Sequence, residues 1–279
     1  MLKEADTTAL SSQCEQCFGL CCVALPYIKS SDFPNDKDSG VPCQHLRADY
    51  QCATHDTLRE NGFKGCTVYE CFGAGQKISQ LTYEGVDWRT GDASHREEMF
   101  DAFPVMQQLH EMLYYLNEAR MREEVVSIHL QLSDMYEKTE KLTLLSGKQL
   151  LQIDIPLHRH EVNQWLTEAS RLVRQSSPPA KKTCQKPKKK KQGLDLLGAN
   201  LQRADLRGES LRGAWLMAAN LQGADLRCAD VIGADFRDAN ISGADLTSTL
   251  FLTQAQVNAC HGDHKAKLPS NLSTPRHWQ

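Results

Sequence analysis

Cysteine is the residue type in this sequence that offers the most chemistry, because thiolates bind soft metals and act as nucleophiles. The chain holds eleven cysteines, and eight of them lie within the first 71 residues. Such a cluster favours disulfides in an oxidising compartment and metal binding in a reducing one. The clustered positions are Cys14, Cys17, Cys21, Cys22, Cys43, Cys52, Cys66 and Cys71.

The sequence favours a reducing compartment. The opening segment MLKEADTTALSS lacks the apolar core of a secretory signal. No apolar run approaches the length of a membrane span. We therefore expect a cytoplasmic, bacterial protein with no membrane segment, in which the clustered cysteines hold metal.

The spacing of the first cysteines suits a metal site. Cys14 and Cys17 stand at i and i+3, so a tight turn or a first helical turn can bring both thiolates onto one ion. Cys21 and Cys22 are adjacent and cannot easily share one ion in ideal geometry. Either one binds metal while the other packs, or the second serves another metal. His45 and His55 are weaker candidates, because a lone histidine near cysteines is more often a surface group or a neighbour of the ligands.

Residues 14–75 resemble a zinc- or iron-chelating domain family that is marked by a CxxCx(2-3)CC opening followed by further cysteines. The resemblance implies that all eight clustered cysteines are candidate ligands, and it leaves the cofactor open between zinc and an iron–sulfur cluster. Thiolates suit both, whereas a histidine ligand would favour zinc. The alternative is a small core of buried, reduced cysteines.

Catalysis by these cysteines is the competing hypothesis. A Cys–His nucleophile requires one thiol, so eight are more than it needs. The stretch Gly73-Ala74-Gly75 is too short for a dinucleotide fingerprint and indicates a tight turn. We expect no catalytic residue here, and we keep a metal- or iron–sulfur-dependent redox or protein-modifying enzyme as the alternative function.

A second pattern occupies residues 194–253, which divide into twelve units of five residues. Alanine opens nine of these units, and a large apolar residue stands third in every one. A helix would spread such residues around its axis, and an uninterrupted strand would send neighbouring ones to opposite faces. Short extended pieces with a corner in each unit allow all of them to point inward. The third residues are Leu196, Leu201, Leu206, Leu211, Leu216, Leu221, Leu226, Val231, Phe236, Ile241, Leu246 and Phe251.

This array resembles the pentapeptide-repeat family, whose pattern is A-[DN]-[LF]-x-x. The resemblance implies a right-handed quadrilateral β-helix with four units per coil, and hence about three coils. Residues twenty apart should then stack, which would align Asn200, Asn220 and Asn240 as an amide ladder. Some members of the family that protect DNA gyrase imitate duplex DNA. The array has five arginines against eight acidic residues, so a gyrase-type role is only weakly supported.

Between the two patterns, residues 94–175 show helical spacing of apolar residues and predict an antiparallel hairpin followed by a third helix. Ser94 and Glu97 are expected to cap the first helix, and His158 and His160 to be solvated residues before the third. Residues 176–193 hold seven lysines and three prolines without an acidic residue, and indicate an extended linker capable of weak nucleic-acid contact.

The expected organisation is a multidomain α+β chain. Residues 1–93 form the cysteine-rich metal module, 94–175 the helical region, 176–193 the linker and 194–253 the β-helix. Residues 254–279 form a C-terminal cap, with a helix from Gln254 to Cys260 and Trp278 over the apolar end. We expect a non-catalytic scaffold that binds a protein partner, and homodimers are possible.

Overall fold

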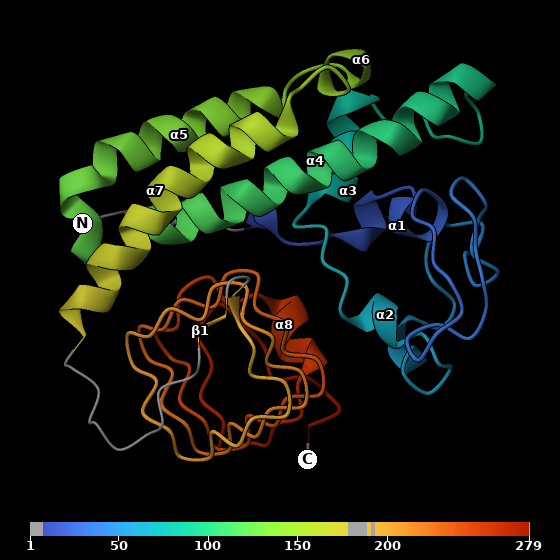
Figure 1. Ribbon diagram of the computed structural model, residues 1–279. Helices are drawn as coiled ribbons and strands as arrows, with labels where there is room; N and C mark the ends of the chain where they lie inside the picture. Colours follow the sequence, from blue (N-terminus) through green and yellow to red (C-terminus); the bar gives the residue numbers. More distant parts are fainter. Residues whose placement is uncertain (1–7, 178–188, 191–192, 279) are drawn as a thin grey trace. The chain divides into compact units, whose positions relative to one another are not determined.

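The computed structural model describes residues 8–177, 189–190 and 193–278 (Figure 1). The chain divides into two compact units. The first combines Met1–Met121 with His129–Leu166, and the second combines Arg122–Ile128 with Thr167–Gln279. The boundary therefore falls inside one long helix, between Leu166 and Thr167.

The first unit begins with a cysteine-rich region built from short helices and turns. Two antiparallel bridges, Tyr27 with Lys37 and Leu46 with Cys52, close loops between these helices. The short elements are η1 (Thr8–Leu10), η2 (Cys14–Gln16), α1 (Leu20–Val23), η3 (His55–Thr57), α2 (Lys64–Thr67), α3 (Ala74–Lys77) and the π-helical η4 (Ile78–Thr82).

Longer helices follow, and α4 (Ala93–Arg120) packs against α5 (His129–Leu142) (Figure 1). Its core-facing side chains are Met99, Phe103, Met106, Leu109 and Leu116, all almost completely buried. The connecting elements are η5 (Glu123–Ile128) and α6 (Gly147–Leu150).

The cap of α4 differs from the one predicted. The side chain of Asp92 accepts a hydrogen bond from the backbone N–H of His95 at 2.8 Å, and the helix begins at Ala93. Ser94 lies within the first turn, so its assignment as the cap was wrong. An aspartate is as good a cap as a serine, and two adjacent candidates cannot be ranked from sequence alone.

The third long helix, α7 (Ile155–Ser176), starts earlier than predicted. Asp154 Oδ1 accepts from the N–H of Leu157, and Pro156 occupies the first turn, where its missing N–H costs nothing. His158 is therefore helical and buried, and its Nε2 lies 2.9 Å from Thr139 Oγ1 of α5. The prediction of a solvated His158 before the helix was wrong, because the helix turns this residue toward α5.

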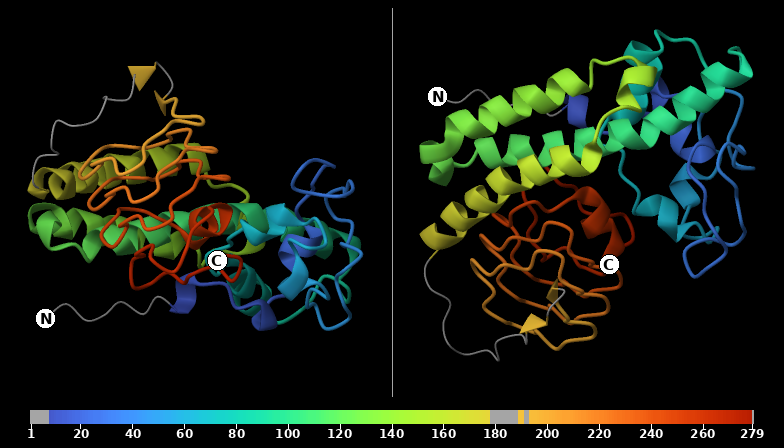
Figure 2. Two further views of the ribbon diagram at one scale, coloured as in Figure 1. Left: turned by 90° about the horizontal axis from the view of Figure 1, so that it is seen from below. Right: turned by 45° about the horizontal axis from the view of Figure 1, so that its top comes forward.

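The array of the second unit is a stack of coils, as Figures 1 and 2 show. Parallel bridges join residues twenty apart, so four units make one coil; for example, Asn200 pairs with Asn220 and Asn220 with Asn240. All twelve third-position side chains are buried. These findings agree with the expected repeat geometry, while the right-handed β-helix remains a prediction.

Each unit turns a corner in the same way. The N–H that opens a unit donates to the carbonyl of the preceding third residue, as Ala204 does to Leu201 at 3.0 Å. The fifth residue of ten units has a positive φ angle, which glycine adopts without strain. This requirement explains the six glycines that end units, such as Gly213 and Gly233.

The chain after the array adds further pairing to the last coil. Asn240 bridges to His261 and Asp245 to Lys267, and α8 (Gln254–Ala259) begins at a capping box formed by Thr253 and Gln256. The Trp278 ring packs against the array core, and its Nε1–H donates to the Cys260 carbonyl at 3.1 Å. The helix lies where it was predicted, within one residue at its end, while the role of residues 254–279 as a cap remains a prediction.

Most of the lysine-rich linker lies outside the described residues. Near its C-terminal end, β1 (Lys189–Lys190) pairs antiparallel with β2 (Gly193–Leu194), which leads into the array. Within the described part of the chain, none of the helices has the length and apolar character that crossing a membrane requires.

Candidate functional site

The eight clustered cysteines lie in the first unit, where contacts link them in two overlapping sets. The first set, named set A, is Cys14, Cys17, Cys21 and Cys71. An added β-carbon on Gly75 would lie 2.7 Å from the Cys17 sulfur and 3.8 Å from the Cys71 sulfur, so these two thiols border the same backbone. Cys14 joins Cys17 through the η2 turn, in which the Cys17 N–H donates to the Cys14 carbonyl at 3.2 Å.

The turn at Gly73 places Cys71 in set A. Gly73 has a φ angle of 84° and precedes α3, and a β-carbon at this position would collide with the Ala9 carbonyl oxygen. The Ser12 hydroxyl lies 3.0 Å from the Cys71 sulfur. The short glycine motif is thus a tight turn beside thiols, as the sequence indicated.

The second set, named set B, is Cys22, Cys43, Cys52 and Cys66. The Cys43 N–H donates to the Cys22 carbonyl at 2.9 Å, and Cys52 bridges to Leu46, which follows Cys43 by three residues. Cys66 lies on α2, which packs through Gly65 against Phe33. Phe33 in turn stacks on Tyr27, whose hydroxyl donates to the Cys43 sulfur at 3.6 Å.

Thiol acidity links the two sets as well, because Cys22 of set B also raises the pKa of Cys14 in set A. Burial raises the pKa of Cys66 to about 12, with further increases from Cys22, Cys43 and Cys52. Burial likewise raises the pKa of Cys14 to about 11, and its next largest contributors are Cys71 and Cys17. Grouped thiols resist ionisation because each thiolate repels the next, so an added cation would favour their deprotonation.

The adjacent cysteines on α1 face different neighbours. Their sulfurs are 3.9 Å apart. A hydrogen bond between them raises the pKa of Cys21 and lowers that of Cys22. Cys17 and Cys14 raise the pKa of Cys21 further, whereas the Lys37 ammonium lowers that of Cys22.

The donor chemistry fits a thiophilic metal. Among residues 8–177, 189–190 and 193–278, no three Cys, His, Asp or Glu side chains are already close enough together to hold an ion. His45 stacks edge-on against Phe63 at 5.1 Å, and His55 is exposed on η3. The eight-cysteine ligand set therefore remains a prediction, and it would require the thiols of a set to turn toward one another.

Two polar groups beside the thiols were missed by sequence reasoning. The Tyr69 hydroxyl is buried with no hydrogen-bond partner among the described atoms. Burial raises its pKa, followed by the influence of Cys71, Cys21 and Cys17, which places it against set A. A lone tyrosine carries no motif, so its role is visible only from packing.

The second missed group is Lys37, which is only 7% exposed. Its ammonium donates to the carbonyls of Val23, Asp38 and Val41 at 3.0–3.2 Å. Burial lowers the pKa of Lys37, while Cys43, Cys22, Cys21 and Asp38 act in the opposite direction. Among the described residues its hydrogen bonds go to carbonyl oxygens, and a lysine as buried as this is unusual.

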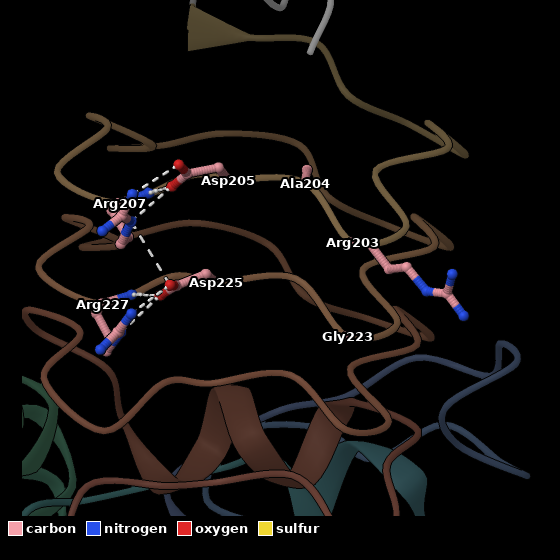
Figure 3. Close-up of a pocket in the computed structure, with 7 residues that line it drawn as sticks. All are labelled: Arg203, Ala204, Asp205, Arg207, Gly223, Asp225 and Arg227. Carbon is pink, nitrogen blue, oxygen red and sulfur yellow. Dashed lines mark hydrogen bonds and ion pairs between the residues drawn. The ribbon is translucent and has the colours of Figure 1, made fainter. Parts of the chain in front are cut away.

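The outer face of the array carries a shallow pocket of about 350 Å³ (Figure 3). Arg207 pairs with Asp205 at 2.8 Å and reaches Asp225 at 3.5 Å, and Arg227 pairs with Asp225 at 2.6 Å. Figure 3 shows Arg203 pointing away from these pairs. The lining residues are Arg203, Ala204, Asp205, Arg207, Gly223, Asp225 and Arg227, which include no thiol, hydroxyl or imidazole.

The same pairs decide whether the acidic residues of the array could imitate DNA. Asp205, Asp225 and Asp245 align in a column, but each has a cationic neighbour, which for Asp245 is Lys267 at 3.6 Å. A column neutralised in this way is a poor imitation of DNA phosphates.

The aligned asparagines make a different contact from the expected amide ladder. The side-chain oxygens of Asn200, Asn220 and Asn240 accept from the backbone N–H two residues later, at 3.0–3.3 Å. Asp225 and Asp235 make the same contact. The second position of a unit thus serves to hold its own corner.

Comparison with known proteins gives two findings. The pentapeptide-repeat family pattern matches residues 195–227 and 214–251, with eight copies of the repeat. A protein of Bacillus subtilis (strain 168), named uncharacterized protein YybG, is 60% identical over 270 residues, which cover 97% of this chain and 95% of YybG.

Proposed function

Because this chain belongs to the same family as YybG of Bacillus subtilis and carries pentapeptide repeats, we propose that it is a non-catalytic scaffold whose array binds a protein partner. The observation that carries the proposal is that each five-residue unit has one position for the interior and others for the surface. The third residue is always buried, so the outward positions are free to form a recognition surface.

The outer surface offers the residue types that protein interfaces favour. Trp215 is 48% exposed and Leu197 is 60% exposed, and the pocket adds three arginines. Tryptophan and arginine dominate the binding energy of protein interfaces. No thiol, hydroxyl or imidazole lines the pocket, and its two carboxylates, Asp205 and Asp225, are paired with Arg207 and Arg227, which favours binding over chemistry on this face.

The second part of the proposal is that the cysteine-rich module binds zinc or an iron–sulfur cluster through its eight cysteines. Four thiolates per site would join segments that are far apart in the sequence. The alternative is a metal- or iron–sulfur-dependent redox or protein-modifying enzyme that uses the same cysteines. A cysteine nucleophile finds little support, because burial raises the pKa of Cys14, Cys17 and Cys66, whereas a nucleophilic thiol needs a lowered one. Cys22 is the exception, since its hydrogen bond with Cys21 lowers its pKa.

A capture experiment with the intact chain tests the scaffold. We expect bound proteins to be lost with Trp215→Ser or Arg203→Glu, and retained with the matched changes Leu130→Ser and Lys148→Glu on exposed positions of the first unit. Equal capture by all four variants would refute a partner on the array. Adding purified gyrase to a supercoiling assay checks the DNA-mimic form of the proposal, for which we expect no inhibition.

A further inference from the structure

We propose that one side of the array is the docking surface for an amphipathic helix of the partner protein, and that this helix carries basic residues beside its apolar stripe. The side, named the tryptophan face, is formed by residues 194–198, 214–218 and 234–238. This inference rests on the proposed scaffold function and specifies where the partner binds and which kind of segment it presents.

The tryptophan face carries an exposed apolar patch. Trp215 is 48% exposed and Leu197 is 60% exposed, and Met217 is partly exposed. The second and fourth residues of a unit point to the same side, because the third points inward. The Gly198 N–H donates to the Met217 carbonyl at 2.9 Å, so Leu197 and Met217 lie on neighbouring coils. The three apolar side chains therefore form one patch, with a tryptophan of the kind that anchors protein interfaces.

The backbone of this face is already paired, which excludes an added β-strand as the partner segment. The Leu196 N–H donates to the Trp215 carbonyl at 3.0 Å, and the Leu216 N–H to the Asp235 carbonyl at 2.9 Å. Strand addition needs an open edge, whereas this face offers side chains only. A helix binds through a stripe of side chains, and its turns of about 5.4 Å nearly match the spacing of about 4.8 Å between coils.

The array already holds helical segments on another of its sides. That side is formed by residues 209–213, 229–233 and 249–253. Its Leu250 is the second residue of a unit and is completely buried. Arg122 of η5 donates to the Thr249 carbonyl at 3.2 Å, and Arg174 of α7 donates to the Gly208 carbonyl at 3.4 Å. Helical chain thus covers a side whose outward positions are apolar, and the tryptophan face has the same character but leaves its apolar residues exposed.

Acidic residues border the patch and favour a basic partner. Parallel bridges place Asp195 and Asp235 on either side of Trp215, and Asp238 is 71% exposed at the corner of the same face. Arg237 pairs with Asp235 at 2.6 Å, so the face holds three carboxylates and one arginine. Complementary charge at the rim of an interface selects the partner and speeds its association. Lysine or arginine beside the apolar stripe would supply that complement.

Binding of synthetic peptides to the full-length chain tests the proposal. Three labelled peptides of about 18 residues, long enough to form a helix, are compared by fluorescence anisotropy. The first has a leucine stripe flanked by lysines, the second has the same composition in scrambled order, and the third has glutamate in place of lysine. We expect the first to bind at least about tenfold more tightly than either of the others. Equal binding of the scrambled peptide would overturn the helix, and equal binding of the glutamate peptide would overturn its basic character.

Substitutions locate the binding on the tryptophan face. Trp215→Ser should weaken binding of the lysine peptide at least about tenfold, and Leu197→Ser is the second variant in case Trp215→Ser does not fold. Leu144→Ser, at a position 68% exposed in the first unit, should leave the affinity unchanged. Unchanged affinity in a folded Trp215→Ser or Leu197→Ser would overturn the location.

Asp238→Asn tests the acidic rim. Asparagine tolerates the left-handed φ of 57° at this corner, so the change removes the charge and keeps the backbone. We expect it to weaken binding of the lysine peptide about two- to fivefold at low salt and less at high salt. Glu60→Gln, an exposed control in the first unit, should have no effect. Equal affinities for the two variants would show that the rim does not select a basic helix.

The outcomes separate this inference from the scaffold function beneath it. If proteins captured by the intact chain are lost with Trp215→Ser or Arg203→Glu while the lysine peptide does not bind, the scaffold stands and the basic helix is refuted. If all capture variants behave alike and the lysine peptide does not bind, both are refuted.

Discussion

Arg212 Nη1 lies 2.8 Å from Asp230 Oδ2, and the Asp230 side chain is completely buried in the array. Asp230 also accepts the N–H of Ile232 at 3.0 Å, so both of its oxygens are occupied. This ion pair crosses from one coil to the next. It is a place where the array buries a full charge and depends on a single cation to compensate for it.

Removing that partner should weaken the array. We expect Arg212→Ala to lower the free energy of unfolding by about 2–4 kcal/mol, slightly less than for a fully buried pair because Arg212 is 25% exposed. Hydrogen exchange of array peptides in increasing urea measures the loss. Arg203→Ala, an exposed control, should change it by less than about 0.5 kcal/mol. An unchanged array in Arg212→Ala would mean that Asp230 tolerates burial unpaired.

The corner position offers a pair of opposite substitutions. Ala218 has a φ of 55° and is exposed, so Ala218→Gly should stabilise the array by about 0.5–1 kcal/mol through relief of left-handed strain. Gly213 has a φ of 60° with open space around it, so Gly213→Ala should cost about 1 kcal/mol through the backbone alone. Thermal unfolding followed by circular dichroism gives both changes, and equal signs for the two variants would contradict the strain argument.

A core substitution should cost more than any surface change. Leu221 is fully buried between Leu201 and Ile241 in neighbouring coils. We expect Leu221→Ala to destabilise the array by about 2–5 kcal/mol, because the coils above and below prevent collapse of the cavity. Its neighbour Gln222 is exposed, so Gln222→Ala should be nearly neutral. Hydrogen exchange of array peptides in increasing urea measures the free energy of unfolding of both variants. Similar costs for the two would show that the interior is not tightly packed.

The first unit should lose stability in mild acid through His110. Burial lowers the pKa of His110 to about 4, and its Nδ1 lies 2.7 Å from the Phe72 carbonyl. The unfolded chain takes up a proton near pH 6.5 while the folded chain does not, so stability falls as pH drops from about 6.5 to about 4. The full effect is about 3 kcal/mol.

Urea unfolding at several pH values measures this slope. His110→Gln should flatten it, leaving the part that belongs to His158, whose pKa burial also lowers. His160 is exposed, and His160→Gln should retain the wild-type slope. A wild-type slope in His110→Gln would assign the acid sensitivity to other groups.

The repeat made much of the second unit predictable. One residue in five must be large and apolar, and the twelve positions that this rule identifies in the sequence are all buried. The cap from Gln254 onward followed from the point at which the rule stops. The corner contacts of Asn200 and its equivalents were not predicted, because the same residue types would also suit a side-chain ladder.

The thiol-rich module was less predictable for a physical reason. Its cysteines could be named from composition, but their grouping depends on turns such as the one at Gly73 and on packing such as that of Phe33 on Tyr27. Lys37 looks like any surface lysine in the sequence. His158 was misplaced because the start of α7 rests on a single aspartate cap, Asp154, rather than on periodicity.

The array follows two different rules, one for its interior and one for its surface. Every fifth residue faces inward, whereas residues stack on one another only at intervals of twenty. A gain or loss of five residues would therefore preserve the apolar filling but shift every later unit by one side, moving Arg227 away from Arg207. The insertion or deletion of one five-residue repeat would therefore change which surface residues are neighbours, while the apolar interior keeps its pattern.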